Sequence, residues 1–169
     1  MLYFCNKLES LIRILYIKIK LLYYKTKYGN RLTLGKHIRF RKGFRIYIDK
    51  NGKVEIGNNV FFNRDCTIDA FYKISIDDDN LFGENVKIYD HNHIFNNKEI
   101  KRGNNFFGKE IKIGKNNWFG SNVVILSGSV IGENNVLGTG NIINNNIAND
   151  SIARLSEDIY KIEKIRYKE

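Results

Sequence analysis

Residues 113–143 read IGKNNWFGSNVVILSGSVIGENNVLGTGNII, and an apolar residue stands at every sixth position of this stretch. These positions are Ile113, Phe119, Ile125, Ile131, Leu137 and Ile143. Earlier series with the same step are Leu34, Phe40 and Ile46; Ile56, Phe62, Ile68 and Ile74; and Ile76, Phe82, Ile88 and Ile94. The step of only two from Ile74 to Ile76 indicates a local bulge or an adjusted corner. Neither the period of a helix nor the alternation of a single strand explains a step of six.

Short strands separated by turns do explain this period. Three six-residue rungs make one triangular coil with the sixfold residues inside, and successive coils pair through backbone hydrogen bonds about 4.8 Å apart. Small or amide residues two places before each sixfold position fill the rest of the narrow core: Asn117, Val123, Ser129, Asn135 and Asn141. Asn and Gly suit the corners because they tolerate positive φ. The sequence therefore predicts a parallel β-helix over residues 31–153.

Two terminal segments are predicted to be helical. In residues 1–30, apolar side chains recur at steps of three and four, as on one helix face: Leu8, Leu11, Ile12, Leu15, Ile19 and Leu22. We expect this basic amphipathic leader to cap the open edge of the first coil; the alternative is that it touches an anionic membrane surface. Residues 154–169 are predicted to form a C-terminal helix that caps the other end, with apolar residues on one side.

Positive charge is concentrated at the start of the chain. The 169 residues carry a formal net charge of +10, and residues 1–53 hold 14 Lys and Arg against only Glu9 and Asp49. Nucleic acid is not favoured as a partner, because no recognition motif accompanies this charge. Cys5 and Cys66 fit neither a disulfide framework nor a zinc ribbon, and no apolar run is long enough for a membrane span. We expect a cytoplasmic protein.

The sixfold pattern breaks over residues 95–110, a polar run that is predicted to project sideways from one coil. Its basic residues include Lys98, Lys101 and Arg102. Loops on rigid scaffolds commonly carry function. Immediately before the loop, Asn92 falls on an inward small position, so His91 and His93 are both predicted to point outward. The spacing alone does not choose between these two imidazoles.

The repeats resemble those of the hexapeptide-repeat acyltransferases of left-handed β-helix fold, in particular the maltose, galactoside and capsular or lipopolysaccharide O-acetyltransferases. The resemblance covers residues 54–153 and rests on the segments 56–63 (IGNNVFFN), 88–93 (IYDHNH), 113–122 (IGKNNWFGSN) and 124–132 (VILSGSVIG). It implies transfer of an acetyl group from acetyl-CoA to a sugar hydroxyl in surface polysaccharide assembly. The chain departs from the family at residues 154–159 (RLSEDI), where members carry a Gly-Asn-Pro-Ala-Lys-like stretch.

An alcohol attacks a thioester poorly unless a base removes its proton, and a neutral imidazole suits that role. The resemblance implies that His93, five places after Ile88, is the general base in a direct transfer, with His91 as a neighbour or the alternative base. Asp90 either forms a turn or orients one imidazole. A metal is not expected, because His37 is the only other histidine.

The resemblance also implies where the two substrates bind. Positions matching the family's pantetheine groove, which lies between subunits, are Trp118, Gly120, Ser121, Gly138, Thr139 and Gly140. Candidates for the CoA phosphates are Lys115, Arg154, Lys161 and Arg166. The acceptor positions are Asn63, Asp65 and Asp69, and the basic loop favours an anionic or lipid-linked glycan. Trp118 is expected to face outward, where an interface or the donor would cover its indole.

The resemblance also implies a homotrimer, because the family's pantetheine groove lies between subunits. Val124, Val130 and Val136 are outward apolar residues six apart, and we expect them to form one apolar column that a neighbouring subunit covers. Two other functions remain open. One is N-acetylation of an amino nucleotide-sugar, which uses the same fold, and the other is a non-catalytic β-helix scaffold.

Overall fold

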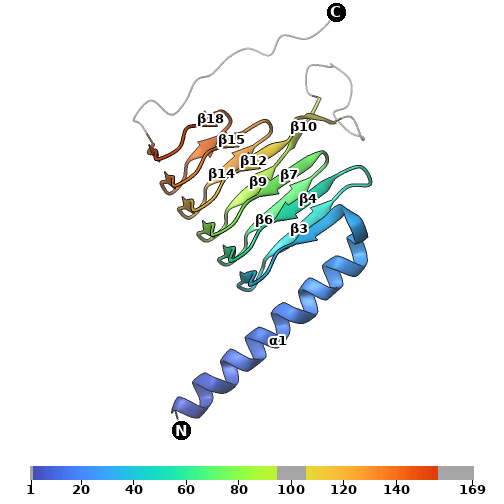
Figure 1. Ribbon diagram of the computed structural model, residues 1–169, viewed down its shortest axis with the longest axis vertical. Coiled ribbons are helices and arrows are strands. Elements are labelled where there is room, and N and C mark those ends of the chain that lie inside the picture. Colours follow the sequence, from blue (N-terminus) through green and yellow to red (C-terminus); the bar gives the residue numbers. More distant parts are fainter. Residues whose placement is uncertain (1, 95–105, 156–169) are drawn as a thin grey trace, which may run out of the picture.

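The computed structural model describes residues 2–94 and 106–155, with side chains described from Glu9 onward (Figure 1). The chain begins with helix α1 (Leu2–Tyr28) and a short 3-10 turn (Gly29–Arg31). It then winds into a solenoid with three parallel sheets. The helix lies at the N-terminal end of this solenoid, and Figure 1 shows its own N-terminus projecting past the edge of the coils.

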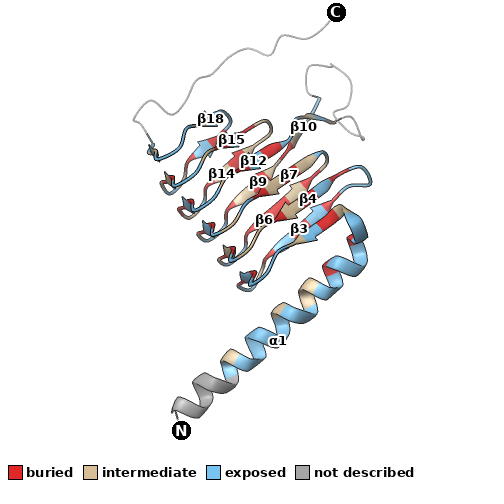
Figure 2. Ribbon diagram, in the orientation of Figure 1, coloured by how far each residue is buried: buried red, intermediate tan, exposed pale blue. Residues whose placement is uncertain are grey.

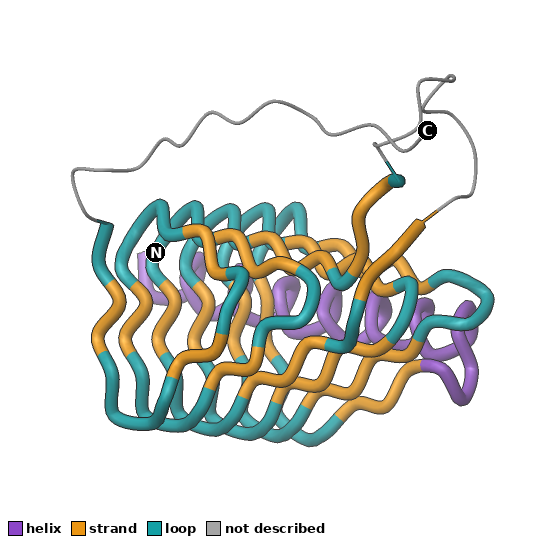
Figure 3. The backbone as a smooth tube through the Cα atoms, turned by 90° about the horizontal axis from the view of Figure 1, so that it is seen from above, coloured by secondary structure: helices purple, strands orange, loops and turns teal. Residues whose placement is uncertain are grey.

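Each full coil contributes one strand to each of three sheets, named here A, B and C. Sheet A has the order β1 (Leu32–Leu34), β4 (Lys53–Ile56), β7 (Lys73–Ile76), β12 (Ile111–Ile113), β15 (Val130–Ile131) and β18 (Asn146–Ile147). Sheet B has the order β2 (Arg39–Phe40), β5 (Phe61–Phe62), β8 (Leu81–Phe82), β13 (Trp118–Phe119), β16 (Val136–Leu137) and β19 (Ile152–Ala153). Sheet C has the order β3 (Arg45–Ile48), β6 (Thr67–Ala70), β9 (Lys87–Tyr89), β14 (Val124–Leu126) and β17 (Ile142–Ile143). Figure 3 shows the stacked coils, and the predicted parallel β-helix is confirmed.

The sixfold residues fill the interior as predicted. Five phenylalanines form a continuous stack with ring centroids 4.5–4.8 Å apart: Phe40, Phe44, Phe62, Phe82 and Phe119. The five small or amide residues predicted to be inward are all buried. One sixfold residue departs from the pattern: Ile94 is 41% exposed, because the chain has already left the coil at that point.

Asparagine side chains join the coils through the core. Asn80 Oδ1 accepts hydrogen bonds from the backbone N–H and the amide of Asn117, at 3.0 and 3.1 Å. Asn117 Oδ1 accepts from the N–H of Asn135 at 2.9 Å, and Asn135 Oδ1 accepts from Ser151 at 2.7 Å. At the corner between sheets A and B, each turn uses a residue with φ between 55° and 62°: His37, Asn59, Asp79, Asn116, Asn134 and Asp150. The predicted role of Asn at the corners is confirmed.

Helix α1 caps the open edge of β3 through polar side chains. The phenol of Tyr24 donates to the carbonyl of Phe44 at 3.2 Å, and that of Tyr28 donates to Ile46 at 2.8 Å. The Arg31 guanidinium donates to the carbonyls of Ile48 and Asp49 at 3.2 and 2.6 Å. An open strand edge needs hydrogen-bond donors for its carbonyl groups, and these side chains provide them.

The predicted cap is therefore present, and the helix face that carries Tyr24 and Tyr28 makes it. The apolar stripe points away from the coils, and its members are between 57% and 67% exposed: Leu11, Ile12, Leu15, Ile19 and Leu22. Aliphatic side chains cannot satisfy edge carbonyls, whereas the tyrosines on the opposite helix face can. The helix is also long, at 27 residues. No helix in the described part of the chain is both long and apolar enough to cross a membrane.

The three valines predicted to share one apolar column lie on three different faces. Val124 is in sheet C, Val130 in sheet A and Val136 in sheet B, because a step of six moves the chain to the next face of the prism. The outward apolar column lies instead on sheet B, where register partners line up across five coils. Its members are Phe61, Leu81, Trp118, Val136 and Ile152.

The predicted side loop begins and ends as a ribbon of two antiparallel strands, β10 (His91–His93) and β11 (Phe106–Gly108). Residues 95–105 lie outside the described part of the chain, and with them Lys98, Lys101 and Arg102. Residues 156–169 also lie outside it, so the predicted C-terminal helix, Lys161 and Arg166 are not part of the description. Arg154 and Leu155, the last described residues, are not helical.

Candidate functional site

Asp90 anchors the point where the ribbon leaves the third coil. Its carboxylate is fully buried and accepts hydrogen bonds from the backbone N–H groups of Phe71 and Tyr72, each at 2.8 Å. Its Oδ1 also lies 3.1 Å from Nδ1 of His91. Both roles considered for Asp90 are thus realised, because the same carboxylate holds the turn of the preceding coil and faces an imidazole.

His91 is held tightly beside this carboxylate. Its side chain is only 15% exposed, and its ring packs against Phe71 and Phe106 with centroids 5.6 and 5.1 Å apart. The predicted inward position of Asn92 is wrong. Asp90 occupies the inward place, and Asn92 is exposed, since the chain turns out of the coil after Asp90 and enters the ribbon.

His93 lies further out on the ribbon and is exposed. Its ring centroid is 4.4 Å from that of Phe106, so Phe106 contacts both imidazoles. Sequence reasoning missed Phe106, although two adjacent aromatic residues in an otherwise polar run were a usable signal. The antiparallel pairing of His93 with Phe106 and of His91 with Gly108 fixes both histidines at the corner between sheets C and A.

An open pocket of about 370 Å³ lies on the outer face of sheet C beside this corner, and we refer to it as the edge pocket. Its lining includes Tyr28, Tyr47, Asp69, Phe71, His91 and Phe106. The last turn of α1 lies at one side and the ribbon at the other. His91 lines the edge pocket, and its lining residues do not include His93. The pocket offers aromatic surface together with carboxylate and imidazole groups.

Asp69 is the carboxylate of the edge pocket. Burial raises its pKa, and the nearby His91 acts in the opposite direction. The pKa of Tyr89, in the same sheet, is also raised, first by burial and then by the negative charge of Asp69. Asp69 is therefore a partly desolvated hydrogen-bond acceptor in front of His91. This environment suits its predicted role in binding the molecule that receives the acetyl group.

The other two residues predicted to bind the acyl acceptor do not lie beside Asp69. Asn63 and Asp65 lie in the turn between sheets B and C, before β6 begins at Thr67. The side chain of Asn63 accepts a hydrogen bond from the N–H of Arg64 at 2.9 Å, and Asp65 has a φ of 60°. Both residues thus contribute to the turn, and the three predicted acceptor residues do not form one cluster within the protomer.

The residues predicted to bind the acyl donor do lie together, at the corner between sheets B and C in the last coils. We call them the donor cluster: Trp118, Gly120, Ser121, Gly138, Thr139, Gly140 and Arg154. Gly120 donates to the carbonyl of Leu137, and Gly138 donates to that of Ala153, so these glycines stack in neighbouring coils. The N–H of Gly140 donates to Ser121 O at 2.9 Å. Trp118 is 54% exposed, as predicted.

Close packing explains why glycine stands at this corner. A Cβ atom on Gly120 would lie 2.6 Å from the backbone nitrogen of Thr139, whereas one on Gly138 would lie 3.1 Å from the carbonyl oxygen of Ala153. Gly140 has a φ of 77°, which side chains disfavour. The glycines therefore have a structural role of their own at this corner.

The histidines and the donor cluster occupy different corners of one protomer, with the outer face of sheet C between them. No hydrogen bond or ring contact joins the two groups within residues 2–94 and 106–155. Within the described residues, the two groups therefore form separate clusters.

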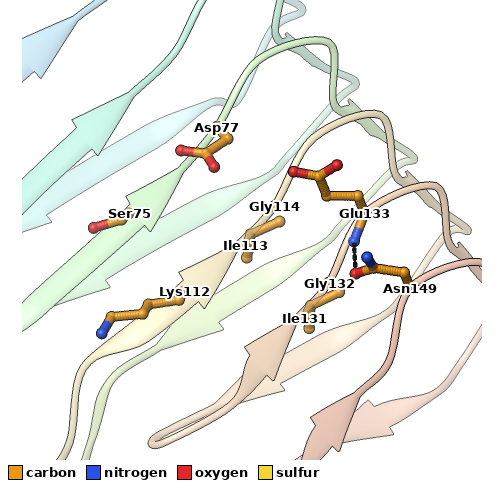
Figure 4. Close-up of a pocket in the computed structure, with 9 residues that line it drawn as sticks. All are labelled: Ser75, Asp77, Lys112, Ile113, Gly114, Ile131, Gly132, Glu133 and Asn149. Atoms are coloured by element: carbon orange, nitrogen blue, oxygen red, sulfur yellow. Dashed lines mark hydrogen bonds between the residues drawn. The ribbon is translucent and has the colours of Figure 1, made fainter.

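A second pocket, of about 350 Å³, lies on the outer face of sheet A and contains none of the predicted site residues (Figure 4). Its charged residues are Asp77, Lys112 and Glu133, and the N–H of Glu133 donates to Asn149 Oδ1 at 2.9 Å. His37 lies in a turn between sheets A and B, with a φ of 58°. Nowhere in the described ranges do three or more His, Cys, Asp or Glu side chains form a group suited to a metal ion.

Comparisons with known proteins agree with this architecture. The family described as bacterial transferase hexapeptide (six repeats) matches residues 110–145. A galactoside acetyltransferase solved in complex with coenzyme A is 29% identical, with a TM-score of 0.62, over 72% of this chain and 59% of that one. A maltose O-acetyltransferase from Clostridium difficile 630 is 30% identical, with a TM-score of 0.59, over 71% of this chain and 63% of its own. No curated protein sequence matches the chain.

A hexapeptide-repeat acetyltransferase from Vibrio cholerae O1 biovar eltor, complexed with acetyl coenzyme A, has a TM-score of 0.62. At 23% identity over 72% of this chain and 64% of that one, it supports the fold alone. The chain thus spans about three fifths of the length of these three relatives. The sixfold core, the three parallel sheets and the matched repeat segment place this chain among the hexapeptide-repeat proteins of left-handed β-helix fold.

Proposed function

We propose that this protein transfers an acetyl group from acetyl-CoA to a hydroxyl group of a bacterial surface glycan or its precursor. The observation that carries the proposal is the pair of imidazoles that contact Phe106, of which His91 lines the edge pocket. The similarity to a galactoside acetyltransferase and a maltose O-acetyltransferase supports the sugar acceptor and the acyl donor. The expected cytoplasmic location stays a prediction.

His93 is proposed as the general base. Its exposed imidazole takes the proton of the acceptor hydroxyl while that oxygen attacks the thioester carbonyl. As the tetrahedral intermediate collapses, the carbon–sulfur bond breaks and the imidazolium returns the proton to the leaving thiolate. His91, held by Asp90 inside the edge pocket, is the alternative base and otherwise contacts the acceptor.

The acceptor is proposed to bind in the edge pocket. Asp69 accepts hydrogen bonds from sugar hydroxyls, and the aromatic rings of Phe71 and Phe106 pack on the sugar ring. A partly buried carboxylate of raised pKa is a strong hydrogen-bond acceptor once a ligand displaces the remaining water. Asn63 and Asp65 are proposed to act only from a neighbouring protomer, because they do not line the edge pocket of their own protomer.

A homotrimer is proposed to complete the site. The donor cluster of one protomer lies next to the histidine corner of its neighbour, which resolves the separation seen within a single chain. The apolar column on sheet B supports this assembly, since Leu81, Trp118 and Ile152 are 44%, 54% and 62% exposed in the protomer. Exposed apolar surface in a continuous column is typical of an interface.

The test is acetyl transfer by the purified protein to a panel of bacterial glycans, read as thiol release and as mass gain of the glycan. Mild alkali then removes ester-linked acetyl groups and leaves amides, which distinguishes O- from N-transfer. His93→Ala is expected to lower kcat by about 10²- to 10⁴-fold. His37→Asn is the matched control, because Asn tolerates the positive φ at that turn.

The outcomes of this test identify the base and distinguish an O-acetyltransferase from an N-acetyltransferase and from a scaffold. Loss with His91→Ala but not with His93→Ala transfers the role of base to His91. Alkali-stable acetylation indicates an N-acetyltransferase. Unchanged rates in both histidine variants, or no transfer to any acceptor, would leave a scaffold as the remaining function.

A further inference from the structure

The apolar stripe of α1 does not pack on the coils of its own protomer. Ile17, Leu21, Tyr24 and Tyr28 pack on the first coil, and at 100° per residue the stripe lies on the opposite side of the helix. Leu15, Ile19 and Leu22 are 59%, 60% and 67% exposed. Figure 2 shows the helix exposed along most of its length, so this stripe forms the outer surface of the N-terminal end of the molecule.

Cationic side chains border the stripe on both sides. The same helical geometry places Lys18 and Lys25 along one border and Arg13 and Lys27 toward the other. Lys20, on that second side, turns to the first coil and donates to the carbonyl of Phe44. Residues 2–28 contain six Lys and Arg but only one acidic residue, Glu9. An apolar face between two rows of cations is the pattern of a helix that lies in the interface of an anionic membrane.

Beside the stripe, α1 and the first two coils enclose a groove of about 630 Å³, which we call the basic groove. Ile12, Tyr16 and Phe40 form its apolar wall. Its cations are Arg13, Arg41, Lys42 and Arg64, against the single carboxylate of Glu9. None of these four cations takes part in an ion pair with another described residue. The groove thus offers unneutralised positive charge next to apolar surface.

We propose that α1 binds the surface of an anionic phospholipid bilayer, with the apolar stripe among the acyl chains and the basic groove on the lipid phosphates. The charge favours a bilayer over a second copy of this chain as the occupant. Two copies joined through their stripes would bring like-charged borders together, whereas a bilayer of anionic lipids supplies the opposite charge. This inference does not depend on the proposed acetyl transfer.

The test is flotation of the full-length protein with vesicles of phosphatidylcholine alone and of phosphatidylcholine with phosphatidylglycerol. We expect binding to the anionic vesicles only, weakened as salt is raised from about 0.1 to about 0.5 M. The double variant Leu15→Gln/Ile19→Gln is expected to reduce binding by about ten-fold or more, because it removes apolar insertion. Ile142→Gln, at a site that is 61% exposed in sheet C, is the matched control and is expected to bind normally.

A second variant tests the basic groove separately. Arg41→Gln/Lys42→Gln/Arg64→Gln is expected to weaken binding by roughly 100-fold, at about five-fold per cation near the surface. Lys36→Gln/Lys50→Gln/Lys115→Gln removes the same charge at other exposed sites and is expected to cost much less. Circular dichroism confirms that each variant is folded.

Three results would overturn the proposal. The first is equal binding to neutral and anionic vesicles, or none to either. The second is binding that survives the stripe variant unchanged. The third is a lower oligomer mass for the stripe variant in the absence of vesicles, which would assign the stripe to contacts between copies of this chain.

Discussion

Asp90 Oδ1 lies 3.1 Å from Nδ1 of His91, and the same carboxylate accepts two backbone hydrogen bonds from the preceding coil. An asparagine at this position has only one acceptor oxygen and cannot reproduce all three contacts. Asp90→Asn is expected to destabilise the protein by about 1–3 kcal/mol because a buried N–H loses its partner. Urea unfolding measures the change, and Asp79→Asn, at an exposed turn position, is the control expected to unfold like wild type.

The cap on β3 gives a second prediction. The phenol of Tyr24 donates to the carbonyl of Phe44 and accepts from the N–H of Ile46, both at 3.2 Å, and burial raises its pKa to about 12. Tyr24→Phe is expected to lower the free energy of unfolding by about 1–3 kcal/mol. Tyr23→Phe is the matched control, since that ring is 54% exposed and its loss of a hydroxyl should be neutral. Equal effects of the two variants would show that the cap contributes nothing through this phenol.

The ion pairs of Glu55 lead us to expect that the free energy of unfolding depends on pH. It pairs with Lys53 at 2.7 Å and with Lys73 on the adjacent strand at 2.9 Å, and these partners lower its pKa from 4.5 to about 2. A lowered pKa stabilises the fold above pH 4.5, and this contribution is lost as the pH falls toward 2. Because the carboxylate is 32% exposed, the contribution is at most about 1 kcal/mol after screening.

The measurement is the midpoint of urea unfolding at intervals from neutral to strongly acidic pH. Glu55→Gln is expected to flatten the loss of stability in the acid range relative to wild type. Parallel curves for the two proteins would contradict the assignment of the pKa shift to this pair. Glu110→Gln, whose partner Lys112 is 56% exposed, is the matched control.

The glycines of the donor cluster differ in how closely the next coil approaches. Gly120→Ala would place a Cβ 2.6 Å from the backbone of Thr139, which side-chain rotation cannot relieve. It is expected to lower stability by about 1–3 kcal/mol, and Gly138→Ala, with a 3.1 Å approach, by less. Thermal unfolding of the two variants makes the comparison, and the reverse order would contradict the coil packing described here.

The apolar column on sheet B predicts the interface of the proposed trimer. Leu81→Gln is expected to weaken self-association, seen as a lower mass in analytical ultracentrifugation on dilution. Val130→Gln changes a side chain of similar exposure on sheet A, 42% against 44%, and is expected to leave the mass unchanged. A mass that responds to Val130→Gln instead would move the interface to sheet A.

Much of the fold could be predicted because the repeat is local. A sixfold step fixes which side chains enter the core, so the burial of Phe119 and Asn117 follows from position in the chain alone. The predicted column of Val124, Val130 and Val136 is wrong, because one step of six leads to the next face and three steps are needed to return to the same face.

The orientation of α1 and the pairing of the two ribbon strands depend on contacts that the spacing of apolar residues in the sequence does not determine. An apolar stripe is usually the buried side of a helix, but here the carbonyls of β3 required donors, and Tyr24 and Tyr28 supplied them. The pairing of His93 with Phe106 joins residues on either side of the break in the repeat. The histidines and the donor cluster of the candidate site were therefore named from the sequence, while their grouping into two corners came from the structure.

Because the coils stack at a regular spacing, the number of coils between two features sets their distance along the solenoid axis. The cap of α1 is on the first coil, and the ribbon with His91 leaves the third, so two coil steps of about 4.8 Å set the histidines roughly 10 Å beyond the first coil. With α1 on a bilayer, as we propose, the histidines of the proposed active site would stand at a fixed height above the lipid, and that height would restrict which acceptor hydroxyls reach them.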